Sequence, residues 1–402
     1  MAEAMPSGLP LTAPAAPAIA AGLLAAFVGF ASSFAVIVKG LTAVGATPAQ
    51  AASGLMALSI AMGLCAVILS LKTRLPVSIA WSTPGAALLA TTGMAEGGFA
   101  AAIGAFLVCS ALIVLAGLWR SLGRWVAAVP AALANAMLAG VLLGLCLAPV
   151  KAVIQAPAMG LAIVIAWAVT AKLRRLYAVP VAVLVAALLI ATTTTFPAGS
   201  LGDLWPRAEI VMPQFPLSAM IGIALPLFIV TMASQNIPGI AILNANGYRP
   251  APGPLFTTTG IFSLLAAPFG GHGVNLAAIT AALCAGEEAG PDPKARYWAA
   301  AISGFAYILL GLGAQAATAF MTAAPPILIE AVAGLALLGA FGTALLGAMK
   351  EAEDREAAVM TFLVTASGLS FFGIGGAFWG LAAGGAVMAL GRWRRGNRQP
   401  GL

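Results

Sequence analysis

The chain has 402 residues, of which 61% are hydrophobic and only 8% are charged, and its mean hydropathy is +1.03. Soluble domains carry about 25% charged residues, so this composition excludes a water-soluble globular protein. The formal net charge is +7, but the basic residues are scattered between apolar runs, which excludes a basic nucleic-acid-binding domain. A membrane helix needs roughly 20 apolar residues, so the length allows many crossings joined by short loops.

The first half of the chain holds seven apolar segments after a short tail. Residues 1–17 are rich in Ala and Pro and contain no Lys or Arg, so they lack the basic start of a secretory signal and are expected to form a disordered cytoplasmic tail. Charge, Pro or Gly bounds the segments that follow, at about 18–38, 50–71, 76–92, 98–118, 128–148, 153–170 and 178–197.

A polar connection with Asp203, Arg207 and Glu209 leads to seven more segments and a basic tail at 392–402. Seven is odd, so the second set enters the membrane in the opposite orientation, which is the condition for an inverted repeat. We therefore predict an all-α membrane protein with fourteen transmembrane segments in two inverted seven-helix repeats. The second set lies at about 217–236, 252–268, 272–286, 297–317, 325–347, 356–372 and 374–391.

The placement of basic residues supports this count. With a cytoplasmic N-terminus, every Lys and Arg except Lys39, Lys151 and Arg207 falls in a cytoplasmic loop or tail. Cytoplasmic loops of membrane proteins are enriched in Lys and Arg. A wrong number of crossings in either half would scramble this bias. Both termini are therefore predicted to be cytoplasmic.

The third segment of each set breaks the helical pattern. The first reads PVSIAWSTPGAALL from Pro76, with an extended β-branched start, Ser82 or Thr83 as a plausible N-cap and Pro84 at the first helical position. The second reads APFGGHGVNLAAIT from Ala267, where three glycines preclude a regular helix before Val274. We predict half-helices preceded by short strands; either segment alone is also compatible with a kinked membrane helix. Matching interruptions in two halves point to a transporter binding site.

Four motifs follow one another along nearly the whole chain: STPGAAL from Ser82, ASQNIPG from Ala233, GGHGVNLAAIT from Gly270 and EAVAGLALLG from Glu330. Together they resemble the benzoate transporter (BenE) family of bacterial proton symporters. The resemblance implies a secondary transporter of the bacterial cytoplasmic (inner) membrane that carries an aromatic monocarboxylate, such as benzoate, together with protons. It is more specific for the family than for the substrate.

That family is in turn similar to the nucleobase permeases, and the likeness implies their division of the chain. A core domain would come from 18–118 and 217–317, and a gate domain from 119–200 and 318–391, with elevator movement of the core and room for a homodimer through the gate. In the uracil permeases an acidic residue of the Tyr-Gly-Glu-Asn run falls on His272, and the acidic residue of helix 8 falls on Gln235. Both departures remove a negative charge, as a carboxylate substrate would require.

The two half-helix starts define the expected substrate site. Helix N-termini offer unpaired N–H groups and partial positive charge, so we expect the substrate carboxylate between Gly85 and Gly273. No Arg lies in these segments, which favours a monocarboxylate over a phosphate or dicarboxylate. The other expected binding residues are Ser82, Thr83, Gln235, Asn236, Gly271, His272 and Asn275, with Phe34 or Phe269 facing the ring.

Two ionisable residues are candidates for proton coupling. His272 is the sole histidine, and an intramembrane group that titrates near neutrality is a functional hypothesis by default. Its alternative is a neutral ring donating to a backbone carbonyl. Glu330 follows Pro325-Pro326, so a first-turn carboxylate stabilised by the helix dipole is favoured over a second proton site. For Gln235 and Asn236, the alternative to substrate binding is interhelical hydrogen bonding. For Phe34 and Phe269, it is packing.

The remaining function classes have less support. The four cysteines lack metal or disulfide spacing, and no nucleophile–base pair or cofactor motif is present, so neither an enzyme nor a cofactor is expected. Sodium coupling usually needs a carboxylate, which both breaks lack. A nucleobase or other small aromatic permease and an anion channel on the same scaffold remain alternatives. The expected partners are a small carboxylate, protons and lipid, without nucleic acid.

Overall fold

The computed structural model describes residues 13–94, 96–119, 130–193, 207–277, 279–372 and 374–396, and it is almost entirely helical. The predictions for residues 1–12, for Asp203 and for the end of the basic tail lie outside these ranges. The elements of the first half are α1 (Ala16–Ala43), α2 (Pro48–Thr73), β1 (Ile79–Trp81), α3 (Thr83–Thr92), α4 (Gly98–Leu118), α6 (Ala131–Cys146), α7 (Ala148–Gln155), α8 (Pro157–Leu173), a 3₁₀ turn (Arg175–Tyr177) and α9 (Ala178–Thr193).

The second half begins with a long helical run, α10 (Leu217–Ala219), a π-helix (Met220–Ala224), α11 (Leu225–Thr231), a second π-helix (Met232–Asn236) and α12 (Ile237–Ala245). It continues with α13 (Pro252–Ala266), a 3₁₀ turn (Ala267–Phe269), β2 (Val274–Leu276), α14 (Ile279–Ala285), a 3₁₀ turn (Glu287–Ala289) and α15 (Tyr297–Leu312). It ends with α16 (Ala314–Ala323), α17 (Pro326–Met349), a 3₁₀ turn (Ala352–Asp354), α18 (Arg355–Ala366), β3 (Ser370–Phe371), β4 (Ile374–Gly375) and α19 (Gly376–Gly396).

The expected segments agree with these helices at most places, and the differences lie in the sixth, eighth, tenth and eleventh segments and before α19. The sixth segment starts within α7, because Pro149 and Pro157 each open a separate helix. The eleventh is bent by 56° between α15 and α16. The eighth runs on to Ala245, and the hairpin β3–β4 before α19 was not predicted. Within the described residues, six helices are long and apolar enough to span a membrane, or seven with the bent pair, so the count of fourteen stays a prediction.

The predicted interruption of the third and tenth segments is confirmed. Strand β1 pairs antiparallel with β2, with Ile79 opposite Leu276 and Trp81 opposite Val274. Strand β2 ends at Leu276 and the helix α14 is described from Ile279, which is later than the glycine pattern indicated. Segments nearly two hundred residues apart are thereby joined by main-chain hydrogen bonds in the interior of the protein, where unpaired backbone groups would be costly.

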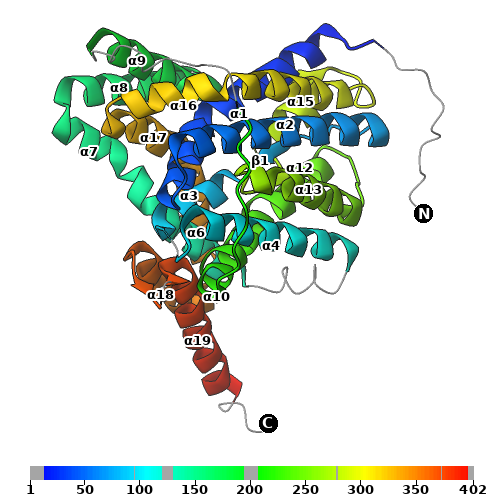
Figure 1. Cartoon of the computed structure of the whole chain (residues 1–402). Helices are drawn as coiled ribbons and strands as arrows, with labels where there is room; N and C mark the ends of the chain where they lie inside the picture. Colours follow the sequence, from blue (N-terminus) through cyan, green and yellow to red (C-terminus); the bar gives the residue numbers. More distant parts are fainter. Residues whose placement is uncertain are drawn as a thin grey trace.

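Two groups of helices can be followed in Figure 1. Helices α1, α2, α13 and α15 lie side by side, with α4 packed along α13. Helices α6, α17, α18 and α19 form the second group, and α7, α8 and α9 pack beside α17. Helix α1 contacts both α17 and α9, so it lies at the boundary between the groups.

Small residues allow close helix contacts. In α19, a Cβ on Gly380 or Gly384 would collide with Thr365 or Thr361 of α18, so these glycines let the two backbones approach. Gly63 of α2 and Gly304 of α15 face each other in the same way. Apolar side chains bring little hydrophobic gain to association within lipid, so membrane helices depend on such close packing.

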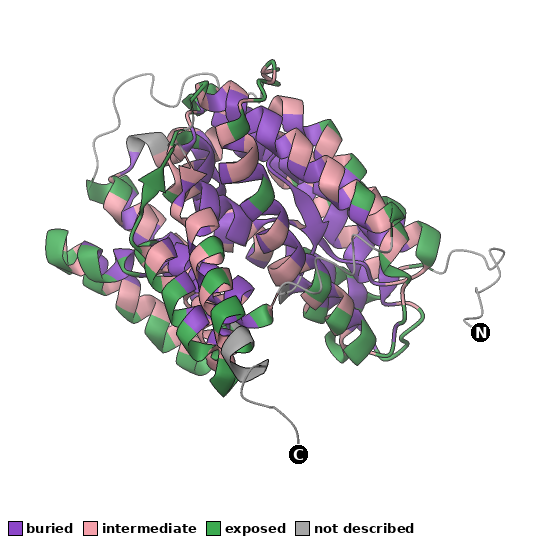
Figure 2. Ribbon diagram, turned by 90° about the horizontal axis from the view of Figure 1, so that it is seen from below, coloured by how far each residue is buried: buried purple, intermediate pink, exposed green. Residues whose placement is uncertain are grey.

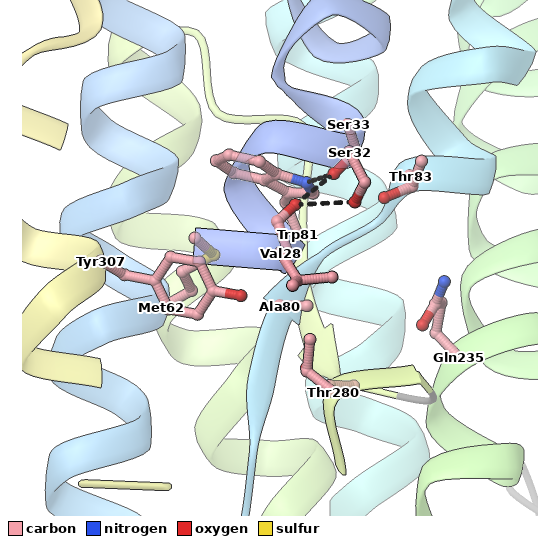
Figure 3. A pocket seen from close by; sticks show the side chains of 12 residues that line it. Val28, Ser32, Ser33, Met62, Ala80, Trp81, Thr83, Gln235, Thr280 and Tyr307 are labelled. Atoms are coloured by element: carbon pink, nitrogen blue, oxygen red, sulfur yellow. Dashed lines mark hydrogen bonds between the residues drawn. The ribbon is translucent and has the colours of Figure 1, made fainter. Parts of the chain in front are cut away.

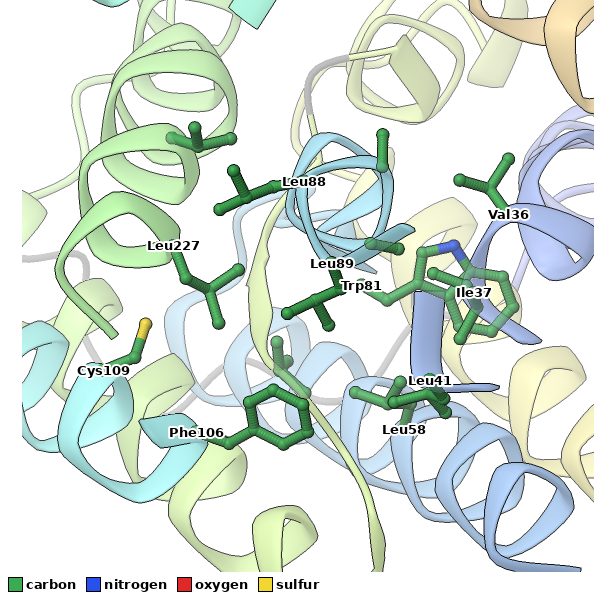
Figure 4. Close-up of a cluster of buried hydrophobic side chains, with 14 of the residues drawn as sticks. Val36, Ile37, Leu41, Leu58, Trp81, Leu88, Leu89, Phe106, Cys109 and Leu227 are labelled. Carbon is green, nitrogen blue, oxygen red and sulfur yellow. The ribbon is translucent and has the colours of Figure 1, made fainter. Parts of the chain in front are cut away.

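The half-helix α3 lies in the centre of the buried core. Leu88 and Leu89 of α3 are fully buried between Ile37 of α1, Phe106 of α4 and Leu227 of α11, as Figure 4 shows. The outer surface is different: Figure 2 shows exposed residues along the outside of the helices, and many of them are large and apolar, such as Leu188 of α9. An apolar exterior around a buried core is what a lipid environment requires.

Candidate functional site

A pocket lies where the paired strands meet the starts of the two half-helices. It encloses about 460 Å³ of space free of protein atoms, including its open mouth. Figure 3 shows Thr83, Gln235 and Thr280 along one side of it and Met62 and Tyr307 on the other. The complete lining is Val28, Gly29, Ser32 and Ser33 of α1, Met62 of α2, Ala80 and Trp81 of β1, Thr83, Gln235, Ala277, Thr280 and Tyr307.

The start of α3 is fixed by Ser82, which is fully buried. Its Oγ accepts a hydrogen bond from the N–H of Gly85 at 3.1 Å, so Ser82, one of the two predicted candidates, is the N-cap, and Thr83 takes the first helical position expected for Pro84. The Ser82 hydroxyl also forms a hydrogen bond with the hydroxyl of Thr231 in α11, at 2.9 Å. Thr83, the first residue of α3, therefore enters the pocket from a helix start that is held in place on two sides.

The polar lining of the pocket is entirely uncharged. The Nε1–H of Trp81 donates to Ser33 Oγ at 2.8 Å, and the hydroxyls of Thr280 and Ser78 lie 3.1 Å apart. The side chain of Gln235 is partly exposed in the pocket, and its amide makes no hydrogen bond to another described residue. Hydroxyls and a free amide around a helix N-terminus suit a small anion or a neutral polar group, because they donate without adding a fixed negative charge.

The π-helix Met232–Asn236 orients Gln235 and Asn236 differently. Pro238 has no N–H for the carbonyl of Ser234, so the helix widens just before it; Pro226 follows the other π-helix in the same way. Gln235 lines the pocket, whereas Oδ1 of Asn236 accepts from the N–H of Leu276 in β2 at 3.0 Å. Asn236 thus links this helix to the strand pair, which is the structural role considered as its alternative.

Aromatic rings continue from the pocket along α1. The Trp81 and Tyr307 ring centroids lie 6.4 Å apart, and Phe30 tilts against Trp81 at 5.4 Å. Phe34 stacks on Phe30 at 5.7 Å but lines a different cavity, so it does not face the pocket. An aromatic ligand would find Trp81 and Tyr307 in the pocket wall, and ring contacts of this kind favour aromatic guests.

His272 is fully buried behind the pocket and is not part of its lining. Its Nε2 lies 2.8 Å from the carbonyl oxygen of Ser82, and its ring meets Phe106 edge-on at a centroid distance of 6.2 Å. Its Nδ1 is buried without a hydrogen-bond partner in the described residues. The ring therefore has one nitrogen tied to the α3 cap and one nitrogen free.

Gly271, Gly273 and Asn275 make hydrogen bonds to the main chain of other residues and do not line the pocket. The Gly273 carbonyl accepts from the N–H of Ser82 at 3.2 Å, and the Gly271 N–H donates to Ala266. Asn275, oriented to donate to the Leu276 carbonyl, accepts from Ser82 at 3.0 Å. No helix starts at Gly273, because the strand pairing uses residues 274–276 and the next helix is described only from Ile279; one of the two helix starts on which the carboxylate position between Gly85 and Gly273 was predicted is therefore missing.

Three further expectations change. A Cβ on Gly85 would lie 2.6 Å from Leu227, so Gly85 is a packing position. Phe269 lies in the 3₁₀ turn before β2 and its carbonyl accepts from Ser53, with its ring outside the pocket lining. Glu330 is the fifth residue of α17, beyond its first turn, and its Oε1 lies 2.7 Å from Lys39 Nζ of α1. The favoured helix-dipole interpretation of Glu330 is therefore wrong.

Of the predicted residues, only Thr83 and Gln235 line the pocket, with Ser82 directly behind Thr83. Sequence reasoning missed Ser32 and Ser33, although two adjacent hydroxyls in an apolar segment are a usable signal. It also missed Trp81 and Thr280, which stood inside the motifs already singled out. Among the described residues, no group of His, Cys, Asp or Glu could hold a metal ion.

Comparison with known proteins adds the family. The family model described as "BenE: Benzoate membrane transport protein" matches residues 13–390. The inner membrane protein YdcO of Escherichia coli (strain K12) is 42% identical over 93% of this chain and 95% of its own length. The benzoate membrane transport protein of Acinetobacter baylyi is 29% identical over 90% of this chain and 92% of its own length.

Among solved structures, the transmembrane domain of the cyanobacterial bicarbonate transporter BicA matches with a TM-score of 0.60 and 15% identity, over 92% of this chain and 96% of that one. At that identity the likeness establishes the fold, which is that of a membrane transporter. The many apolar helices, the paired strands β1 and β2 between interrupted segments, and the match over nearly the whole length agree with one another. The chain is thus a multi-pass membrane transporter that belongs to the BenE family of benzoate membrane transport proteins.

Proposed function

We propose that this transporter carries an aromatic monocarboxylate, with benzoate as the first candidate, in symport with a proton. The observation that carries the proposal is the central pocket: uncharged, lined by hydroxyls and a free amide, open at the start of α3 and walled by Trp81 and Tyr307. The name of the Acinetobacter baylyi relative, a benzoate membrane transport protein, supports the same substrate.

The pocket chemistry suggests how the substrate would lie. The carboxylate would take hydrogen bonds from the start of α3 at Thr83 and from the amide of Gln235, where the helix dipole also favours negative charge. The ring would lie against Trp81 and Tyr307. Since no lining residue is cationic, a second carboxylate would remain uncompensated, which favours monocarboxylates.

We assign the coupled proton to Nδ1 of His272. A charged imidazolium, fully buried against Phe106, is costly unless an opposite charge is near. A carboxylate beside Thr83 lies next to Ser82, whose carbonyl contacts His272, so occupation of the pocket would supply that charge. Proton and anion would then bind with positive coupling, and each would raise the affinity for the other. Glu330 is left out of this assignment because it pairs with Lys39.

The movement that we propose follows from the two helix groups. Every element of the pocket comes from the ranges 18–118 and 217–317, predicted as the core domain, while the predicted gate supplies the neighbouring α6, α9 and α17. An elevator displacement of the core would carry the pocket intact. We further propose a cytoplasmic (inner) membrane location with both termini cytoplasmic, as the distribution of Lys and Arg indicates.

The decisive test is uptake of labelled benzoate into proteoliposomes with and without an inward proton gradient. The proposal expects saturable accumulation that requires the gradient and is competed by benzoate analogues more strongly than by uracil or aliphatic acids. Accumulation driven by sodium alone, or stronger competition by uracil, would overturn it. Electrical current without saturable, pH-driven uptake would identify an anion channel instead.

A further inference from the structure

One face of α1 connects three features of the molecule. Val28, Ser32, Ala35 and Lys39 follow one another at intervals of four, three and four residues, so their side chains lie on one stripe of the helix. Val28 and Ser32 line the central pocket, and Ala35 lines a second cavity. Lys39 forms the ion pair with Glu330 of α17. The stripe thus leads from a charged pair, past a cavity, to the pocket.

The second cavity lies between α1 and the helices α9, α16 and α17. It holds about 300 Å³ of space free of protein atoms, including its open mouth, and its walls are apolar, with Phe34 and Ala35 on one side and Ala187 and Ile329 among the residues opposite. Ligand sites in proteins are concave and mostly apolar, and they occur preferentially between packed helices, so this hollow between two helix groups suits an aromatic ring. The stacked rings of Phe34 and Phe30 continue from this cavity to Trp81 of the central pocket.

The ion pair adjoins the cavity on both helices. Glu330 directly follows Ile329, a wall residue, and Lys39 lies one helical turn beyond Ala35, another wall residue. Both charged side chains are only about a third exposed, at 30% for Lys39 and 33% for Glu330. Charged groups within membrane helices are costly, and they usually mark a substrate or ion pathway.

We propose that the second cavity and Lys39 form an access site for the aromatic carboxylate, distinct from the central pocket. The ring occupies the apolar cavity beside Phe34, and the carboxylate replaces Glu330 as the partner of Lys39. Ser32 lies seven residues before Lys39 on the stripe, about 10 Å along the helix at its usual rise, so the ligand passes from one site to the other along α1. This inference rests on the proposed function and adds to it a cationic recognition residue that the pocket itself lacks.

The test separates an access site from a purely structural ion pair. Benzoate counterflow in proteoliposomes, at equal pH on both sides, gives a KM that does not depend on a proton gradient. Lys39→Gln removes the cation and is expected to raise the KM about tenfold, the size expected for losing a charge-assisted hydrogen bond. Glu330→Gln removes the carboxylate that competes with the substrate for Lys39, so it is expected to lower the KM. The double variant is expected to behave like Lys39→Gln alone.

If the ion pair is only structural, both single variants break the same pair, so the KM should shift in the same direction in both. That result, or an unchanged KM in both, would overturn the access site. Ala187→Leu, which fills the cavity, is expected to raise the KM, while Ala191→Leu, at an exposed position one turn further along α9 and outside the cavity lining, is the matched control and leaves it unchanged. An unaltered protein with no benzoate counterflow would instead refute the proposed function. Size-exclusion profiles and thermal unfolding establish that each variant is folded.

Discussion

The Nε2 of His272 lies 2.8 Å from the carbonyl oxygen of Ser82, and both residues are fully buried. This contact joins the glycine-rich turn before β2 to the N-cap of α3. A change in the protonation of the ring therefore acts directly on the helix start that borders the pocket. In the coupling that we propose, the proton binds at the unpartnered Nδ1 and leaves that contact unbroken.

We expect His272→Gln to uncouple transport from the proton. Gln keeps an N–H donor for the Ser82 carbonyl but cannot take up a proton near neutrality, so the α3 cap is preserved while coupling is lost. Benzoate counterflow should continue, and accumulation driven by a proton gradient should fall to the level without a gradient. Full gradient-driven accumulation by His272→Gln would show that the ring is only structural. Equal loss of counterflow, accumulation and thermal stability would lead to the same conclusion.

The neighbours Gln235 and Asn236 form a matched pair for separating binding from stability. Gln235→Leu removes the free amide from the pocket, so we expect weaker benzoate binding with an unchanged unfolding temperature. Asn236→Leu leaves the N–H of Leu276 without its acceptor, at a cost of about 1–3 kcal/mol, so the unfolding temperature should fall. Calorimetric binding and thermal unfolding of both purified variants test this. A reversed pattern would place Asn236, and not Gln235, in the binding site.

The interrupted third and tenth segments were predictable because they break local rules that sequence displays directly. Ser82 before Thr83-Pro84 is a capping signal, and Gly270, Gly271 and Gly273 rule out a regular helix. The family was also recognisable from motifs in four places. These features depend on neighbouring residues, so no knowledge of distant contacts was needed.

The identity of the lining residues was not predictable to the same degree, because it depends on pairing between distant segments. Pairing of β1 with β2 turned Gly273 and Asn275 into backbone partners of Ser82 and delayed α14 until Ile279. The π-helix likewise turned Gln235 to the pocket and its neighbour Asn236 to the strand. Glu330 could not be matched with Lys39 by sequence, since the two lie almost three hundred positions apart.

Gly29 offers a test of how tightly the pocket wall is packed. A Cβ at this position would collide with the hydroxyl of Tyr307, so Gly29→Ala is expected to displace that ring and to weaken benzoate binding strongly. Tyr307→Phe removes the clashing oxygen, and the double variant should regain much of the lost binding. Binding constants for the two single variants and the double variant give the coupling energy between the sites. Additive losses, without recovery, would contradict this arrangement of the wall.

The two prolines that follow the π-helices allow a final comparison. Pro238→Ala supplies an N–H for the Ser234 carbonyl, which allows the π-helix Met232–Asn236 to tighten into α-helix. Losing the extra residue of a π turn rotates its neighbours by about 100°, the angle per residue of an α-helix, and so turns Gln235 away from the pocket. We expect benzoate binding to weaken although the helix itself is not destabilised. Pro226→Ala, the matched change at the π-helix outside the pocket lining, should leave binding nearly unchanged. Equal binding losses in the two variants would mean that the bend of the whole helix, and not the direction of Gln235, sets the affinity.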